Sequence, residues 1–455
     1  MSVKTSLSRI TLLSLFVIIA IAGVMVAILP VIQKPIYDDW VQIWPNFTVG
    51  HLGLITVAST YISTGLGVLF GYMGDKFPRI KVIIIGGIIS SVFSIFTFFA
   101  TNYLQLFFFQ VIVAVGNGSM APAIYSIFSD SYKSENRGSA FAWLSIITGF
   151  IGGLIGTLLF VEIALIDWHL PYLIMGIIGL AFIPILFLLK EPPRGGSENG
   201  LADIYKSDPS LSFQYVIKPE DIKYLWKRRS NLFLIPNLVD NIPGGILFTY
   251  GVSWLAFDHG LNPDNGLILL ALVGLLSMVG TFGFAHIGDK RLKSDNLIRI
   301  KLGIILSIST VPFVLLGVNI PWDATGLDLV QTLMTPIVLT VALIIGAGMA
   351  LDAGIYPNWL SAITEINLPE QRSTMISLGR FFDACGTGLG ELIGALILIF
   401  MPGEYTFMMS FAVLFTFLSF IWWVPALKFY RKDYEEVQNI LSKRAEELKP
   451  KVKSA

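Results

Sequence analysis

The sequence predicts an all-α membrane protein, with twelve transmembrane helices in two pseudo-symmetric six-helix bundles. Of its 455 residues, 54% are hydrophobic and only 14% are charged. A soluble protein carries roughly 25% charged residues, so this composition is typical of a membrane protein. Twelve apolar stretches have lengths of about 20 residues, at which a helix crosses a bilayer. Features of the first six stretches recur in the same order among the last six.

The apolar stretches are separated by short polar loops, with one exception. They cover residues 10–30, 50–72, 81–100, 104–127, 138–160, 170–189, 231–254, 266–287, 299–318, 333–361, 373–400 and 405–427. The exception is a segment rich in charge, Pro and Gly between the sixth and seventh stretches. The predicted domains are therefore a first bundle (1–190), a cytoplasmic linker (191–230), a second bundle (231–427) and a polar cytoplasmic tail (428–455). We expect the tail to form a solvated or surface-lying helix.

The positions of the basic residues predict the orientation in the membrane. If both ends of the chain lie in the cytoplasm, only Lys34 of the 31 basic residues falls in an outer loop, and only Arg380 falls deep within a span. The opposite orientation would place nearly every cation outside, against the positive-inside rule. The first apolar stretch is longer than the core of a cleaved signal, so we interpret it as a retained helix. The expected location is the cell membrane, with both termini cytoplasmic.

A short charged segment, residues 71–81, joins the second and third spans. It begins with Gly71 and Gly74, and small residues let two helix ends approach closely. Asp75 can accept hydrogen bonds from neighbouring amides or basic groups, and Arg79 holds the turn on the cytoplasmic side. A weaker copy of the segment, containing Asp289, lies 214 residues later.

A second repeat is sharper than the first. Asp130 precedes Arg137 by seven residues, and Glu365 precedes Arg372 by seven residues. The two pairs are separated by the same offset of 235 residues. An acid and an arginine thus recur with the same spacing in both halves of the chain. This indicates two bundles that have the same topology and the same orientation in the membrane.

The spacing G-x-x-G-D-x-x-x-R-x-K from Gly71 to Lys81 resembles the signature loop of the major facilitator superfamily. This resemblance implies two bundles that face a central cavity, bind substrate near the bilayer midplane and rock to expose it to either side. In that family, charges at such positions latch the outward-facing state. The resemblance therefore implies a gating role for Gly71, Gly74, Asp75, Arg79, Asp130, Arg137, Asp289, Glu365 and Arg372.

Two local features resemble the spinster-like branch of that superfamily, which exports lipid-like molecules. The stretch from Ala114 to Ser119 is similar to that branch's G-x-G-E-A segment, with Asn117 at the Glu position. The stretch Glu191-Pro192-Pro193-Arg194-Gly195 is similar to its E-P-x-R-G segment. The first span lacks the charged residues expected at the proton-coupling site of that branch.

Ionisable residues inside the spans are the candidates for binding and ion coupling. A charge within a span costs at least roughly 2.5 to 3.5 kcal/mol, so each is a functional candidate. At the 235-residue offset, Asn117 stands opposite one of them, Asp352. The predicted substrate-binding or ion-coupling set is Asp240, Asp352, Arg380, Asp383, Asn117 and Glu391.

Arg380 and Asp383 are three residues apart and therefore share a helix face. The expectation is that Arg380 holds an anionic substrate group while Asp383 or Asp240 exchanges a proton. The alternative is a salt bridge between Arg380 and Asp383 that only neutralises both charges.

The sequence thus predicts a secondary active transporter, coupled to an ion such as a proton, that carries a small organic or lipid-like anion and works as a monomer in the bilayer. The zero net charge argues against a nucleic-acid partner. One Cys and four His offer neither a nucleophile with its base nor a metal cluster, so no enzyme activity, cofactor or metal is expected. A channel would need a repeated ring of pore-lining residues rather than two pseudo-symmetric halves, so a channel is not expected. A non-transporting sensor on the same fold remains the alternative, and an observed flux would separate the two.

Overall fold

The computed structural model describes residues 7–45, 49–155, 160, 163–164, 166–198, 201, 203–204, 226–261, 263–401 and 403–453. Within these residues all regular structure is helical, which confirms the predicted all-α class. Eleven described helices are long and apolar enough to cross a membrane. The predicted span 138–160 is formed by α6 (Ser134–Ile146) and a π-helix, η1 (Ile147–Ile155), each too short to count alone. With this pair, the described chain accounts for the twelve predicted spans.

The chain divides into two compact units. Unit 1 comprises Met1–Leu225, Asn367–Phe381 and Val437–Ala455, and unit 2 comprises Trp226–Ile366 and Phe382–Glu436. The chain passes from one unit to the other within two long helices, α18 (Arg372–Phe400) and α19 (Tyr405–Lys453). The division into bundles at residues 190 and 231 stays a prediction. Much of the predicted linker, 199–200, 202 and 205–225, lies outside the described residues.

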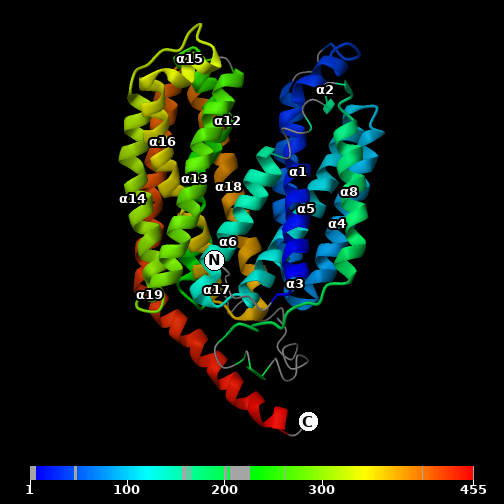
Figure 1. Ribbon diagram of the computed structural model, residues 1–455, viewed down its shortest axis with the longest axis vertical. Helices are drawn as coiled ribbons and strands as arrows, with labels where there is room; N and C mark the ends of the chain where they lie inside the picture. Colours follow the sequence, from blue (N-terminus) through cyan, green and yellow to red (C-terminus); the bar gives the residue numbers. More distant parts are fainter. Residues whose placement is uncertain are drawn as a thin grey trace. The chain divides into compact units, whose positions relative to one another are not determined.

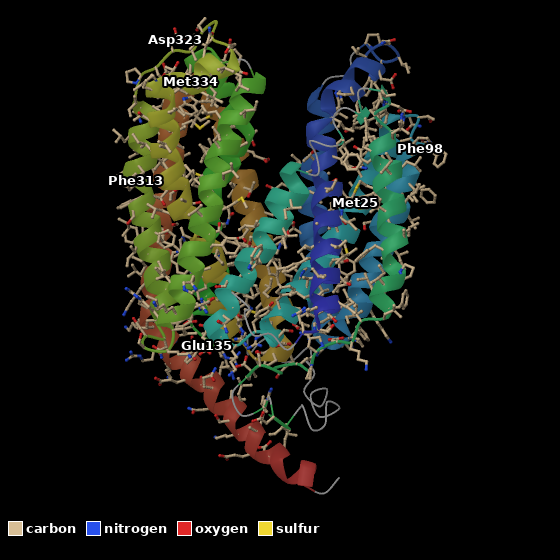
Figure 2. The ribbon with its side chains drawn as sticks, in the orientation of Figure 1. Met25, Phe98, Glu135, Phe313, Asp323 and Met334 are labelled. Atoms are coloured by element: carbon tan, nitrogen blue, oxygen red, sulfur yellow. The ribbon has the colours of Figure 1, made fainter. Side chains whose placement is uncertain are left out.

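Unit 1 is built from the helices that precede the linker. They are α1 (Arg9–Val31), α2 (Gln33–Trp40), α3 (Val49–Lys76), α4 (Arg79–Phe98), α5 (Tyr103–Ser131), α6, η1 and α8 (Leu170–Phe187). Helix α4 packs against α5 and α8, and α3 packs against α5 (Figure 1). Apolar side chains such as Met25 and Ile28 fill the space between these helices. Met25 lies among the helices of unit 1 in Figure 2.

Unit 2 holds the helices that follow the linker. They are α11 (Asn231–Leu234), η4 (Leu238–Asn241), α12 (Ile242–His259), α13 (Pro263–Arg291), α14 (Ile298–Asn319), α15 (Leu329–Met334), α16 (Pro336–Ala353), α17 (Ile355–Glu365) and the larger parts of α18 and α19. Trp254, Val314 and Met408 belong to its core. Phe313 points outward from α14 (Figure 2), as expected for a surface that faces lipid.

Two predicted spans of unit 2 are interrupted, although the sequence analysis treated each as continuous. The span 231–254 consists of α11, the 3₁₀ turn η4 and α12, with Pro236 and Pro243 flanking the turn. Proline lacks the N–H that continues an α-helical ladder, so it favours a break at this point. The span 333–361 is interrupted at Gly354, where a Cβ atom would lie 2.6 Å from Phe284 Cβ.

The tail does not form a separate helix. The last span continues without a break as α19 to Lys453 (Figure 1), and its final part, from Val437, belongs to unit 1. One face of this part is buried, with Val437 fully covered and Leu441 only 1% exposed. The tail is therefore helical as far as Lys453, and one side of this helix is packed.

Candidate functional site

Eight buried charged residues gather at one end of unit 1. We call them the unit 1 charge cluster: Asp75, Arg79, Asp130, Arg137, Glu191, Arg194, Glu198 and Arg372. The ends of α3 and α5 and the starts of α4 and α6 meet here because consecutive helices alternate in direction. No side chain in the cluster is more than 9% exposed. Buried charges are costly unless they are paired, so their partners determine what the cluster can do.

Asp75, the penultimate residue of α3, binds the beginning of α18. Its carboxylate accepts the backbone N–H groups of Ser373 and Thr374 at 3.1 and 2.7 Å, and the Thr374 hydroxyl at 2.6 Å. The first turn of a helix has unpaired N–H groups and a partial positive charge, which a carboxylate satisfies. A Cβ atom on Gly71 would lie 2.0 Å from Ser377 Oγ, so glycine is required for this approach of α3 to α18. Gly74 also lies against Ser373.

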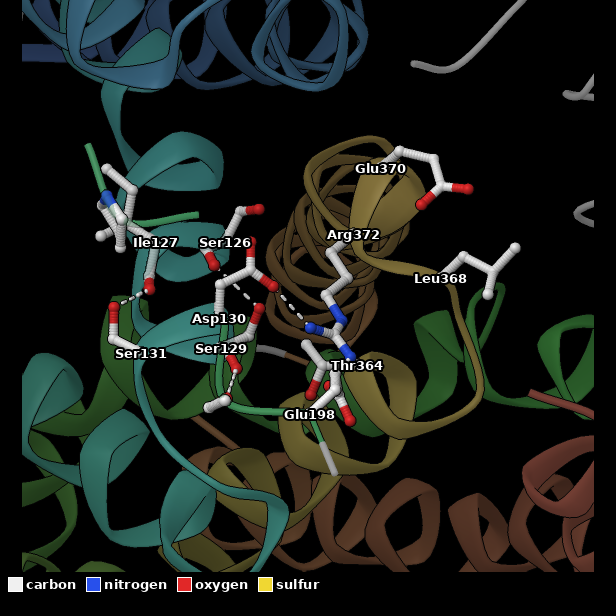
Figure 3. Close-up of polar contacts among 12 residues, drawn as sticks. Ser126, Ile127, Ser129, Asp130, Ser131, Glu198, Thr364, Leu368, Glu370 and Arg372 are labelled. Carbon is white, nitrogen blue, oxygen red and sulfur yellow. Dashed lines mark hydrogen bonds and ion pairs between the residues drawn. The ribbon is translucent and has the colours of Figure 1, made fainter. Parts of the chain in front are cut away.

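Asp130 is shared by two arginines from different helices. Its Oδ2 accepts from Arg79 at 2.5 Å and its Oδ1 accepts from Arg372 at 2.6 Å. Figure 3 shows Arg372 pointing toward Asp130 and Glu198. Arg79 also donates to Glu191 at 2.8 Å. One carboxylate therefore joins the start of α4 to the start of α18.

Glu198 and Arg137 extend this network. Arg137 donates to the carbonyl oxygens of Ser129 and Tyr132 at 2.7 and 3.1 Å, so it satisfies the C-terminal end of α5. Glu198 accepts from Arg137 and, at 2.5 Å, from Arg372. Burial by itself would raise the pKa of Glu198, but the two guanidinium groups lower it to about 2. Glu198 therefore stays ionised at any physiological pH.

The linker residue Arg194 binds the carbonyl groups at the C-terminal end of α3, as Arg137 does at the end of α5. Its guanidinium donates to the carbonyl oxygens of Gly74, Asp75 and Phe77. The next residue, Gly195, has a φ of 69°. This left-handed conformation favours glycine.

Unit 2 has a smaller cluster, which we call the unit 2 charge cluster: Asp289, Arg299, Asn358, Glu365 and Tyr430. Arg299, fully buried near the start of α14, donates to Glu365 at 2.7 Å and to Asp289 at 3.0 Å. The Tyr430 hydroxyl donates to the other oxygen of Glu365 at 2.8 Å. The two predicted gating acids of the second half thus lie together. Their partner Arg299 was not predicted, although it is the first residue of an apolar stretch.

Three of the predicted binding residues lie in unit 2 at or near the two helix breaks. Asp240 belongs to η4, and Asp352 lies two residues before Gly354. The two carboxylates interact electrostatically, and Ser419 is a hydrogen-bond partner of Asp240. Asp383, on α18, accepts from the Asn241 amide at 3.0 Å. The η4 break therefore lies beside a polar contact, between Asn241 and Asp383, inside a membrane unit.

Close backbone packing explains why Asn241 reaches Asp383. A Cβ atom on Gly386 would lie 2.0 Å from the carbonyl oxygen of Leu238, and one on Gly390 would lie 2.1 Å from that of Ile242. Helix α18 therefore contacts the main chain of η4 and α12 directly. Small residues allow such close approach between membrane helices.

The remaining predicted binding residues are placed differently. Glu391 is half-buried on α18, and its carbonyl oxygen accepts from the Tyr250 hydroxyl at 2.9 Å. Arg380 is half-buried and belongs to unit 1, since the unit boundary follows Phe381. Asn117 is 5% exposed in α5, and neither side-chain atom of its amide has a hydrogen-bond partner. Pairing of Arg380 with Asp383 stays a prediction.

Comparison with known proteins identifies the family. The family model described as Major Facilitator Superfamily matches residues 10–335. The chain belongs to this superfamily. The resemblance predicted from residues 71–81 is thereby confirmed. Major Facilitator Superfamily proteins are membrane transporters rather than enzymes. Among the described residues, no three His, Cys, Asp or Glu side chains are grouped to hold a metal ion.

Individual relatives are more distant. The chain is 23% identical over 271 residues to a probable sulfoacetate transporter of Cupriavidus necator, a match covering 58% of this chain and 62% of that protein. It is 30% identical over 176 residues to spinster homolog 3 of Danio rerio, a match covering 36% of this chain and 32% of that protein. The chain thus matches less than two thirds of the length of either relative.

A solved structure of a bacterial homolog to the human lysosomal transporter Spinster has the same fold. It aligns with a TM-score of 0.54 and 19% identity, over 93% of this chain and 97% of that one. These matches confirm the resemblance to spinster proteins within the Major Facilitator Superfamily. The stretch Glu191–Gly195, which carried part of that resemblance, supplies Glu191 and Arg194 to the unit 1 charge cluster. Glu198 lies three residues beyond this stretch. No motif in the sequence predicted a role for it.

Proposed function

We propose that this protein is a secondary active transporter that works by alternating access and moves a small organic or lipid-like anion. The observation that carries this proposal is the placement of Asp240 and Asp352 at breaks in two apolar spans. Transporters typically build substrate and ion sites from such discontinuous helices, because unwound backbone and polar side chains become available for binding. An ionisable residue within a span is otherwise too costly to retain without a function.

The carboxylates of unit 2 are suited to carry the coupling proton. Asp240 and Asp352 interact electrostatically, and carboxylates coupled in this way can hold and exchange a proton. Asp383 accepts a hydrogen bond from the Asn241 amide, which places its carboxylate beside the η4 turn. Arg380 is the anion anchor in this proposal, since a guanidinium forms strong paired hydrogen bonds with carboxylate, sulfonate or phosphate. Asn117 and Glu391 complete the proposed binding set.

The unit 1 charge cluster is the proposed cytoplasmic gate. It is buried and extensively paired, and it holds the start of α18 against α3 and α5. Opening on this side would require these pairs to separate. The proposal places both chain ends in the cytoplasm of a cell membrane, following the basic residues of the loops. It treats the transporter as a monomer.

Flux of organic anions into proteoliposomes tests the function. The substrates to compare are sulfoacetate, lysophospholipids and sphingoid phosphates, with and without a pH gradient. We expect uptake driven by the gradient, with loss of the pH dependence in Asp240→Asn and Asp352→Asn and loss of substrate binding in Arg380→Gln. Glu404→Gln, which neutralises an exposed acid of unit 2, is the matched control.

Thermal shifts of the purified protein provide the second measurement. A ligand at about 100 times its dissociation constant stabilises the folded state by roughly 2.7 kcal/mol. Stabilisation by an anion together with no flux under any gradient would favour the alternative, a sensor on the transporter fold. An unchanged pH dependence in both Asp→Asn variants would contradict the proton role.

A further inference from the structure

The C-terminal part of α19 is an amphipathic helix whose apolar side is covered. Its buried residues are Val437, Leu441, Ala445 and Leu448, none of them more than 4% exposed. Their spacing of three or four residues places them along one helix face. Ser442, Lys443, Glu446 and Glu447, on the other face, are exposed. This pattern indicates a helix that is bound along its length, and we call residues 437–448 the C-terminal clasp.

The surface beneath the clasp belongs to the linker and to the segment before α18. Leu201 and Ile204 of the linker and Leu368 form one hydrophobic cluster with the four clasp residues. Leu368 precedes the 3₁₀ turn η5 (Pro369–Gln371), which leads directly into α18. The clasp therefore packs beside the residues that position Arg372.

A paired ionic contact fixes the clasp to this turn. The Arg444 guanidinium donates to both oxygens of Glu370, at 3.1 and 2.7 Å. The two side chains are 15% and 8% exposed, so water screens the pair only in part. Two parallel hydrogen bonds also fix the relative orientation of the two groups. In Figure 3, Glu370 points away from the side on which Arg372 meets Asp130 and Glu198.

The turn between these contacts has little freedom. Gln371 closes it with a backbone bond to Leu368 at 2.8 Å, and a Cβ on Gly195 would lie 2.8 Å from Pro369 Cγ. Arg372 follows at once and binds Asp130 and Glu198. A segment anchored on one side by the clasp and on the other by the cluster can move only if both contacts yield.

We propose that Arg444 and the apolar face of the clasp are positioning residues for the gate: they hold the η5 turn so that Arg372 stays in the unit 1 charge cluster. The C-terminus thus stabilises the closed gate through the η5 turn. This inference rests on the gating role proposed above for the cluster.

Hydrogen exchange of the full-length protein, measured on the peptide that contains Ser373 and Thr374, tests the proposal. Asp75 accepts a hydrogen bond from each of these two amides, and the proposal requires that these bonds break when the gate opens. Leu441→Ser should speed their exchange about tenfold, which corresponds to about 1.4 kcal/mol. Lys443→Ser, an exposed change on the same turn, should leave it unchanged. Arg444→Glu should act like Leu441→Ser, and the double variant Glu370→Arg/Arg444→Glu should restore slow exchange.

A peptide covering Ile355–Glu365 of unit 2 is the internal reference. If the clasp only supported overall stability, both peptides would exchange faster together, and the proposal would be overturned. It would also be overturned by unchanged or slower exchange in Leu441→Ser, or by failure of the charge reversal to restore slow exchange. The measurement needs no substrate. Absence of flux with the exchange effect intact would reject transport alone, whereas flux without the exchange effect would reject the clasp alone.

Discussion

The charge clusters of the two units contain acids from the same two sequence repeats, but these acids bind different partners. In unit 1, Asp75 binds the start of α18 and Asp130 binds two arginines. In unit 2, the corresponding acids Asp289 and Glu365 share a single arginine, Arg299. The repeats thus specify where the acids stand, but the partner that each acid binds differs between the two units.

The two clusters also differ in the distance along the chain that they bridge. Asp75 and Thr374 are 299 residues apart, and Asp130 and Arg372 are 242 residues apart. Arg299 lies only 10 residues from Asp289 and 66 from Glu365. We expect the unit 2 charge cluster, in which Arg299 joins acids close to it in the chain, to serve stability. A cluster that gathers a distant helix start and part of the linker is suited to a conformational role.

The largest effect is expected from a substitution that breaks the unit 2 charge cluster. Arg299→Leu removes the buried arginine that binds both Asp289 and Glu365, and breaking a buried ion pair in this way costs about 3–5 kcal/mol. We expect a marked fall in the melting temperature of the purified protein. Arg372→Leu should destabilise less, because Arg79 still binds Asp130 and Arg137 still binds Glu198. Equal melting temperatures for the two variants would remove the distinction between a structural and a conformational cluster.

The next largest effect is expected in the pH dependence of folding stability that Glu198 contributes. Its pKa is about 2 in the folded protein, below its ordinary value of 4.5, so its stabilising contribution is present above pH 4.5 and is lost as the pH falls toward 2. The shift corresponds to a free energy of the order of 3 kcal/mol. Melting temperatures between pH 4.5 and 2 should fall more steeply in the wild type than in Glu198→Gln. Parallel curves would show that Glu198 does not carry this dependence.

A smaller effect is expected from a substitution that disturbs the close contact between α3 and α18. Gly71→Ala places a methyl group against Ser377, and overpacking of this kind costs about 1–3 kcal/mol. We expect faster hydrogen exchange at Ser373 and Thr374. Gly65→Ala on the same helix, where a Cβ atom meets nothing within 4 Å, is the matched control. Equal exchange in the two variants would mean that α3 does not hold α18 through this contact.

The smallest effect is expected for an exposed pair near the unit 2 charge cluster. Lys301 binds Asp295 at 2.5 Å, but the two side chains are 47% and 27% exposed. Such pairs contribute about 0–1 kcal/mol. Lys301→Met should therefore leave the melting temperature almost unchanged. A fall as large as that of Arg299→Leu would show that the surface of the α13–α14 turn, and not the buried arginine, stabilises this unit.

Much of the fold and some of the site could be predicted from the sequence. The spans follow from the apolar stretches, and the repeated acids Asp130 and Glu365 both occupy buried charge clusters. The breaks beside Asp240 and Asp352 were not predicted, although Pro236 marks one of them. Hydropathy averages over about 20 residues, so it does not register a short break within a span. The gating and binding roles stay predictions.

By itself, the sequence determined the membrane class, the spans and the positions of the paired acids. These depend on local quantities, the transfer of side chains from water to lipid and the spacing along a helix. Only the tertiary structure decided that Arg299 would join Glu365, that Arg194 would bind the end of α3 and that the C-terminus would pack beside Arg372. These contacts depend on which helix ends meet, and packing between segments far apart in the chain determines that.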